Sequence, residues 1–235
     1  MTVREYFDRI YVINLAYRTD RRRGIVEEFS RAGMPLEPGK VEIFPGVRPD
    51  SAGDFPSLGC RGCFLSHLGV LKHAKQQGLK NVLVFEDDCV ISPRFPAEQH
   101  ALVDQLKSTD WGMVYFGHIE PVGEAQSARL IPYTHPMITA HFYGVNGPTL
   151  DGLISFMEAL QTRPPGHIDG GPMFPDGAFS FYRGRHRELL TLIAEPNLGT
   201  QRSSASDITA RWWDRTPVLR QLAGAARRVK AAIKR

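Results

Sequence analysis

The sequence predicts an α/β fold, in which one doubly wound parallel sheet is sandwiched between helices. Two observations support this class. Apolar, strand-like segments alternate with segments of helical periodicity, and the connections between them are short. Alternating strands and helices are typical of a parallel sheet that is covered by helices on both faces.

Each element of the first half has its own signal. The apolar segment 10–15 predicts a buried strand, and Thr19 or Asp20 is expected to cap the helix that follows. Apolar residues at helical spacing, such as Ile25 and Phe29, continue that helix to a glycine. In order, the expected elements are a strand at 10–15, a helix from 19 to about 32, a strand at 41–44, a helix at 65–77, a strand at 81–86, a helix near 96–107 and a strand at 111–117.

The second half is less regular. Its expected elements are two extended segments within 129–146, a helix from about 150 to 162, a strand at 189–195 and a polar loop at 199–206. Residues 163–187 are rich in Pro, Gly and aromatic residues and have little periodicity. Long irregular stretches inside a compact domain are usually functional, so we expect this one to serve the site.

The charge distribution divides the chain into a domain, residues 1–210, and a basic tail, residues 211–235. The tail holds eight Arg or Lys and one Asp, a charge of +7, so the remaining residues sum to −3 within the total of +4. The basic balance therefore argues only weakly for a nucleic-acid-binding domain. Apolar residues recur at helical spacing from Val218 to Ile233, which predicts a basic amphipathic helix. Such a helix suits an anionic membrane surface, and a solvated helix packed on the domain is the alternative.

Other sequence features predict a cytoplasmic protein, peripheral on the inner face of the cell membrane if the tail binds lipid. No apolar run approaches the roughly 18 residues that cross a bilayer, and charges interrupt the N-terminus where a signal peptide is apolar. Three cysteines fit a reducing compartment. Cys60 and Cys63 form a C-x-x-C that invites a zinc or redox interpretation, but Cys89 alone supplies no second ligand pair. Ordinary buried thiols are the better interpretation.

The strand at 81–86 runs directly into three acids, Glu86, Asp87 and Asp88. Side chains alternate along a strand, so Glu86 and Asp88 are expected on one side and Asp87 on the other. Ligands of open α/β sheets bind at the carboxyl ends of the strands, and paired carboxylates there suit Mg²⁺ or Mn²⁺. A solvated turn is the alternative for an isolated acidic triplet.

Missing residues exclude some classes of protein and argue against others. A response-regulator receiver needs a later phosphoaccepting Asp and a Lys, yet no Asp lies between Asp110 and Asp151 and no Lys between Lys107 and Lys230. The chain has no G-x-x-x-x-G-K phosphate loop, which removes a P-loop enzyme. The absence of G-x-G-x-x-G after the first strand argues against a dinucleotide-dependent dehydrogenase, and the absence of a G-x-S-x-G elbow argues against a hydrolase that uses one.

Seven segments in order resemble glycosyltransferase family 25, the bacterial lipopolysaccharide sugar transferases and their collagen-modifying relatives. The segments are YVINLAYRTDRR at 11–22, GCRGCFLSHLGVLKHA at 59–74, NVLVFEDD at 81–88, WGMVYFG at 111–117, TAHFYGVN at 139–146, PDGAFSFYR at 175–183 and QRSSASDI at 201–208. The resemblance covers roughly residues 9–210. It implies a GT-A-like fold, a nucleotide-sugar donor (commonly UDP-galactose), a glycan acceptor such as a lipopolysaccharide oligosaccharide, and inversion at the anomeric carbon.

The resemblance also implies site residues. The acids become the Mn²⁺ or Mg²⁺ site for the donor diphosphate, with Asp88 and Glu86 as ligands and Asp87 contacting the donor. A divalent cation neutralises the charge that the leaving diphosphate develops. The remaining donor-binding candidates are Asn14, Arg18, Arg21, Ser66, His67, Gln201, Ser206 and Asp207. Ser66 and His67 are expected at the start of a helix, where backbone donors favour an anion.

An inverting enzyme needs a base that deprotonates the acceptor hydroxyl. Asp176 matches the family segment and is the first candidate, and Asp169 is the second, although an Asp-Gly turn is an alternative role for both. His141 and Tyr143 are expected either in the sugar pocket or in the core. Two rival functions stay open: a carbohydrate- or nucleotide-binding protein without turnover, and a metal-dependent phosphohydrolase.

Overall fold

The structure is a computed structural model of the 235-residue chain, and it describes residues 1–202. Ser206, Asp207 and the basic tail therefore lie outside the described residues. The helices are α1 Val3–Tyr6, α2 Thr19–Arg31, α3 Leu58–Gln76, α4 Phe95–Lys107, α5 Gly147–Thr162 and α6 Pro175–Arg185. The strands are β1 Arg9–Asn14, β2 Val41–Pro45, β3 Asn81–Glu86, β4 Cys89–Ile91, β5 Met113–Gly117, β6 Arg129–Pro132, β7 Phe142–Asn146, β8 Thr191–Glu195 and β9 Gly199–Gln201.

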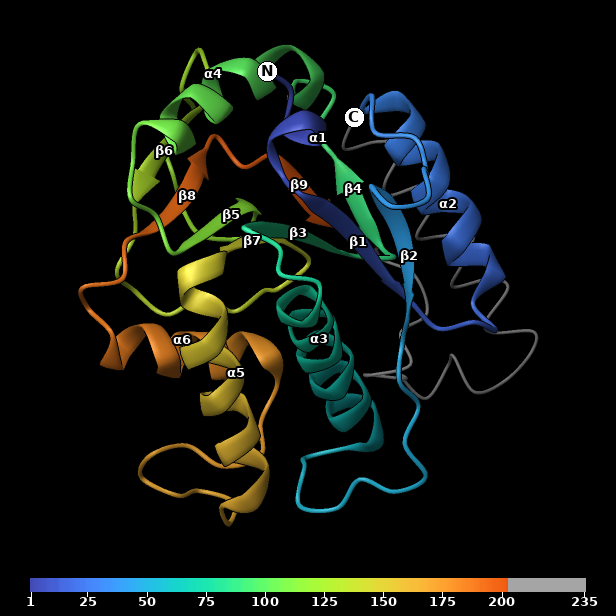
Figure 1. The fold of residues 1–235 in the computed structure, drawn as a ribbon, viewed down its shortest axis with the longest axis vertical. Helices are drawn as coiled ribbons and strands as arrows, with labels where there is room; N and C mark the ends of the chain where they lie inside the picture. Colours follow the sequence, from blue (N-terminus) through green and yellow to red (C-terminus); the bar gives the residue numbers. More distant parts are fainter. Residues whose placement is uncertain (203–235) are drawn as a thin grey trace.

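Seven of these strands form one sheet in the order β2-β1-β3-β7-β5-β8-β6 (Figure 1). The pairs β1 with β2, β1 with β3, and β5 with β8 are parallel, whereas β7 and β6 run antiparallel to their neighbours. The predicted α/β class is confirmed, with antiparallel β7 inserted in the mostly parallel sheet and antiparallel β6 at its edge. β1 and β3 are adjacent and parallel, so the residues that follow them meet at one edge.

Helices cover both faces of the sheet (Figure 1). One apolar core joins α1, α2 and α4 to the sheet, and within it Phe85 stacks on Phe142 and meets Phe29 edge-on. The other core joins α3, α5 and α6 to the opposite face, around Tyr143 and Phe179. Burial of large rings on both faces fixes the sheet between two helical layers.

The short helix α1 was not predicted, and three other helices differ from the sequence prediction. α3 begins at Leu58, seven residues before the predicted start, because the Ser57 side chain accepts a hydrogen bond from the backbone N–H of Cys60. α6 lies within the stretch predicted to be irregular, and packing of Phe179 in the core stabilises it despite its glycines. α2 has Arg18 at its N-cap without a side-chain cap, so neither Thr19 nor Asp20 caps it.

A small second sheet returns the end of the described chain to the acidic strand. β4 pairs with β9 antiparallel, and the backbone N–H of Arg202 donates to the Asp88 carbonyl at 2.7 Å. Neither strand was predicted, because three-residue strands carry almost no pattern. This pairing brings Gln201 beside Glu86 at the end of β3. Within residues 1–202, none of the helices has the length and apolar character needed to span a membrane.

Candidate functional site

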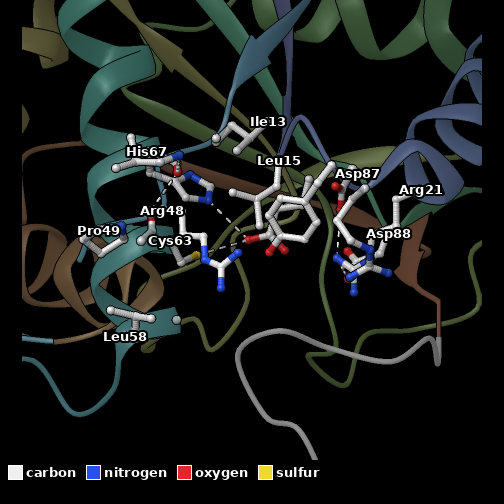
Figure 2. Close-up of a pocket in the computed structure, with 18 of the residues that line it drawn as sticks. Ile13, Leu15, Arg21, Arg48, Pro49, Leu58, Cys63, His67, Asp87 and Asp88 are labelled. Carbon is white, nitrogen blue, oxygen red and sulfur yellow. Dashed lines mark hydrogen bonds and ion pairs between the residues drawn. The ribbon is translucent and has the colours of Figure 1, made fainter. Parts of the chain in front are cut away.

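A cavity of about 460 Å³ opens where β1 and β3 end, beside the first turns of α3 (Figure 2). Of the residues proposed from sequence, it is lined by Arg18, Arg21, Ser66, His67, Glu86, Asp87, Asp88 and Gln201. These residues come from segments far apart in the chain, and the parallel pairing of β1 with β3 brings them to one edge. The position agrees with the rule that open α/β sheets bind ligands at the carboxyl ends of their strands.

Asp87 is held by the end of β1 and the start of α2. The Asn14 side-chain amide donates to Asp87 Oδ2 at 2.7 Å, and Arg21 donates to Asp87 Oδ1 at 2.8 Å. The same guanidinium lies 3.2 Å from Asp88 Oδ2. Because both oxygens of Asp87 are engaged, this residue fixes the geometry of the acidic segment.

Glu86 lies at the centre of a second set of contacts. Its Oε1 is 3.2 Å from His67 Nε2, and its Oε2 accepts a hydrogen bond from the Gln201 amide at 2.9 Å. Burial alone would raise the pKa of Glu86, but the hydrogen bond and charge of His67, with Arg21 and His141 nearby, leave that pKa below its ordinary value. Glu86 is therefore held as a carboxylate.

Of the three acids, Asp88 is the one with an oxygen that lacks a hydrogen-bond partner within residues 1–202. Burial, followed by the charge of Glu86, raises the pKa of Asp88 to about 7, although Arg21 opposes the shift. Among the described residues, Oδ1 of Asp88 is buried and has no hydrogen-bond partner. A buried carboxylate oxygen without a partner is costly, and a bound cation would relieve that cost. The environment of Asp88 thus fits a site for a hard divalent cation.

Arg18, Ser66 and His67 lie in the cavity wall. Arg18 makes two hydrogen bonds of 3.0 Å to the Asp20 carboxylate, and its side chain is mostly buried. Ser66 accepts from the Val47 N–H at 2.8 Å, so it ties the loop after β2 to α3. Ser66 and His67 lie in the middle of α3, and the expectation that a helix N-terminus there binds an anion is wrong.

The two candidate bases lie in different environments. Asp176, in the first turn of α6, is half-buried; burial and then the charge of Glu86 raise its pKa, against a hydrogen bond from the Gly177 N–H. Asp169 is exposed in the loop before α6, and its ion pair with Arg185 at 2.9 Å lowers its pKa. Only Asp176 is electrostatically coupled to the acidic cluster, and neither acid lines the cavity itself.

The later family segment contributes to the core instead of the cavity wall. His141 is buried and contacts the Gly199 carbonyl, while the Tyr143 hydroxyl lies 2.9 Å from His67 Nδ1. Burial raises the pKa of the thiols of Cys60, to about 12, and of Cys63 and Cys89. A reactive redox pair needs a lowered thiol pKa, so Cys60 and Cys63 do not fit one. Cys60 and Cys89 are buried thiols, whereas Cys63 is partly exposed and lines the cavity.

Sequence reasoning did not find all the cavity residues. Tyr17 and Arg48 also line it, with the guanidinium carbon of Arg48 5.3 Å from the centre of the Tyr17 ring. Tyr17 lies inside the first matched segment, and an aromatic residue next to Arg18 could have indicated a place in the donor site. Arg48 lies in a loop without periodicity, so only the structure brings it to Tyr17.

Comparison with solved structures identifies the class of fold. A glycosyltransferase involved in the glycosylation of the major capsid of PBCV-1 has a TM-score of 0.50 and 10% identity, covering 94% of this chain and 98% of that one. The chain thus has a GT-A-like glycosyltransferase fold, as the resemblance implied.

Comparison with sequences finds matches to the family that the chain resembles. Residues 7–121 match the model of Glycosyltransferase family 25 (LPS biosynthesis protein). Human procollagen galactosyltransferase 2 is 31% identical over 129 residues, covering 47% of this chain and 21% of the relative. Human inactive glycosyltransferase 25 family member 3 is 28% identical over 140 residues, covering 52% of this chain and 24% of the relative. The chain thus matches less than a quarter of the length of these two relatives.

Proposed function

We propose that this protein is an inverting, metal-dependent glycosyltransferase that moves a hexose from a nucleotide sugar to a glycan. UDP-galactose is the proposed donor and a lipopolysaccharide oligosaccharide the proposed type of acceptor. The observation that carries the proposal is the buried, unpartnered oxygen of Asp88 beside Glu86, in a cavity that also has arginines in its wall. The family match and a relative named as a galactosyltransferase support the reaction and the sugar.

Asp88 and Glu86 are the residues that would hold Mn²⁺ or Mg²⁺. Oxygen donors suit both ions, and the free Oδ1 of Asp88 supplies a ligand without breaking its ion pair with Arg21. When bound, the cation would stabilise the negative charge of the leaving nucleoside diphosphate. Arg21 and Asn14 hold the acidic segment in place through Asp87.

The donor would lie along the end of β1. Arg18 and Arg48 bring permanent positive charge to the cavity wall, which suits a diphosphate. Tyr17 is 49% exposed in the cavity wall with the Arg48 guanidinium near its ring, and aromatic and arginine side chains are groups on which nucleotide bases stack. Gln201, which donates to Glu86, would close the cavity from the β9 side.

Asp176 is the proposed general base. Its raised pKa makes the ionised carboxylate a stronger proton acceptor than an ordinary aspartate. Asp176 also lies close enough to Glu86 and His67 for their charges to affect that pKa. It would take the proton of the acceptor hydroxyl as that oxygen attacks the anomeric carbon from the side opposite the leaving diphosphate. Asp169 is a poorer candidate, because Arg185 holds it in an exposed loop.

A second candidate function is a carbohydrate- or nucleotide-binding protein without turnover. A specific observation favours it, because one of the matching relatives is named as inactive. A metal-dependent phosphohydrolase is the third. A panel of nucleotide sugars with Mn²⁺, assayed for released nucleotide with and without glycan acceptors, separates the three. Acceptor-dependent release of UDP supports transfer, binding without release supports the second function, and phosphate release from simple esters supports the third.

We also propose that the basic tail, residues 211–235, holds the enzyme on the cytoplasmic face of the membrane near a lipid-linked acceptor. The support is its charge of +7, since each basic residue near an anionic surface contributes about 1 kcal/mol. Binding to anionic vesicles at low salt, lost at high salt and on truncation after Thr216, is expected. Equal vesicle binding by truncated and full-length proteins would contradict the anchor.

A further inference from the structure

Cys63, His67 and Glu86 form a compact cluster on one side of the cavity. Cys63 and His67 are four residues apart on α3 and therefore face the same way, toward the end of β3. Glu86 Oε1 lies 3.9 Å from Cys63 Sγ and 3.2 Å from His67 Nε2, and the three ligand atoms all lie within 4.8 Å of one another. A tetrahedral ion with bonds of about 2.0–2.3 Å keeps its ligand atoms roughly 3.3–3.7 Å apart. The cluster needs only a small contraction to reach that spacing.

The chemistry of the three donors selects a softer cation than the Asp88 oxygen does. Sulfur, imidazole nitrogen and carboxylate oxygen are the ligands of Zn²⁺ in proteins, whereas Mg²⁺ and Mn²⁺ favour oxygen. Cys63 and His67 lie on one side of the cavity and Asp88 on the other, next to Arg21 (Figure 2). The two sets of donors therefore differ in Cys63 and His67 on one side and Asp88 on the other, and they share Glu86, whose Oε1 contacts Cys63 and His67.

His67 is already oriented as a metal ligand. Its Nδ1 lies 2.9 Å from the hydroxyl of the fully buried Tyr143, and the two rings stack with centroids 5.6 Å apart. A histidine that binds a metal through one nitrogen usually has its other nitrogen hydrogen-bonded, which fixes the ring and the tautomer. This contact leaves Nε2 directed at Glu86 and Cys63.

The geometry points to a second cation site, in which Cys63 Sγ, His67 Nε2 and a Glu86 oxygen bind Zn²⁺. Each of the three residues also lines the cavity, so the fourth position faces it and is open to water or an anionic ligand. As the ion binds, the Cys63 thiol releases its proton to solvent and the thiolate coordinates the metal. This site goes beyond the proposed function, because its occupation needs neither a donor nor an acceptor.

The direct test is metal binding by the reduced, tag-free full chain. Co²⁺ serves as the probe, since a thiolate ligand gives it a near-ultraviolet charge-transfer band, and Zn²⁺ affinity is measured by competition with a chromophoric chelator in excess Mg²⁺. We expect the band in the wild-type protein and its disappearance when Zn²⁺ is added. Absence of a thiolate band, or failure to bind Zn²⁺, overturns the proposal without any variant being needed.

Variants locate the site. Loss of an outer contact to a ligand costs about 10- to 100-fold in metal affinity, so Cys63→Ser and His67→Gln should each weaken Zn²⁺ binding by at least that much. Cys60→Ser and Cys89→Ser are matched controls, because both remove a buried thiol outside the cluster and should bind Zn²⁺ as the parent does. Zn²⁺ affinity that is unchanged in folded Cys63→Ser, or lost equally in Cys60→Ser, overturns the assignment.

A consequence follows for activity, and it rests on the proposed function. Glu86 cannot fully serve both ions, so Zn²⁺ should inhibit Mn²⁺-dependent transfer. Inhibition is measured as the ratio of rates with and without Zn²⁺ within each variant, and it should be much weaker in Cys63→Ser than in Cys60→Ser. If Zn²⁺ binds and no transfer is detected with any donor, the zinc site stands and the proposed function fails.

Discussion

Two of the arginine–aspartate contacts within residues 1–202 lie in regions that differ in almost every other respect. At the end of β3, Arg21 pairs with Asp87 and Asp88, with side chains 8–15% exposed. At the end of α6, Arg185 pairs with Asp169 of the preceding loop, with side chains 36% and 53% exposed. The first pair is surrounded by groups from distant parts of the chain, whereas the second joins residues 16 positions apart. An arginine–aspartate pair belongs to the site only in the region where burial strengthens the effect of its charges on neighbouring groups.

The largest effect on activity should come from removing Asp88, the acid with the oxygen that is unpartnered among the described residues. Asp88→Ala is expected to reduce transfer to background without unfolding the domain, because the proposed cation loses its main ligand. The matched change in the exposed region, Asp169→Ala, should leave most of the activity. Transfer rates and circular dichroism of both variants check this, and near-parental turnover by Asp88→Ala would refute the metal assignment, as would full turnover in excess chelator.

The next effect concerns the base. Asp176→Asn keeps the shape of the side chain but cannot accept a proton, so transfer should fall by roughly 10²–10⁴ while donor binding survives. Single-turnover kinetics and nucleotide titrations measure the two separately. If Asp176→Asn transfers at the parent rate, Asp169 becomes the acid to test by the same substitution.

Stability should separate the two ion pairs as clearly as activity does. Arg21→Gln leaves Asp87 and Asp88 buried without their cationic partner, which typically costs about 3–5 kcal/mol. Arg185→Gln removes a solvated pair, for which we expect a much smaller loss of stability. Urea unfolding of both variants gives the comparison directly. Equal losses of stability would mean that burial does not distinguish the two regions.

The smallest expected effect is a shift in the pH dependence of the transfer rate. Burial, then Glu86, raises the pKa of Asp176 above its ordinary value of 3.8, and a base must be ionised to act. The maximal rate should therefore be complete above the raised pKa and should fall as the pH drops through it, at a higher pH than an ordinary aspartate would give. A rate that stays flat down to the ordinary aspartate range argues against Asp176.

The acidic edge could be predicted from sequence because local signals coincide there. One apolar strand ends in the acids, and a second ends at Asn14 and is followed by Arg21. When the two strands pair in parallel, the acids and these two residues lie at the same carboxyl end of the sheet. The contact between Asn14 and Asp87 follows from that adjacency.

What the sequence could not provide depends on packing over long distances. Gly59 and Gly62 lower the helix propensity of the segment before residue 65, which hid the true start of α3 and with it the shared face of Cys63 and His67. Gln201 reaches Glu86 through a three-residue strand, and Tyr143 reaches His67 through an antiparallel strand inserted in the sheet. None of these pairings leaves a periodic pattern in the sequence.

The central claim is that the acids ending β3 form a cation-dependent donor site, and nucleotide binding tests it most directly. UDP titrated calorimetrically into the full chain should bind with Mn²⁺ and lose most of its affinity in chelator. Asp88→Asn should lose the metal-dependent part of the affinity, and Asp169→Asn should keep it. Equal UDP affinity with and without Mn²⁺, or an Asp88→Asn protein that binds as the parent does, would contradict the account.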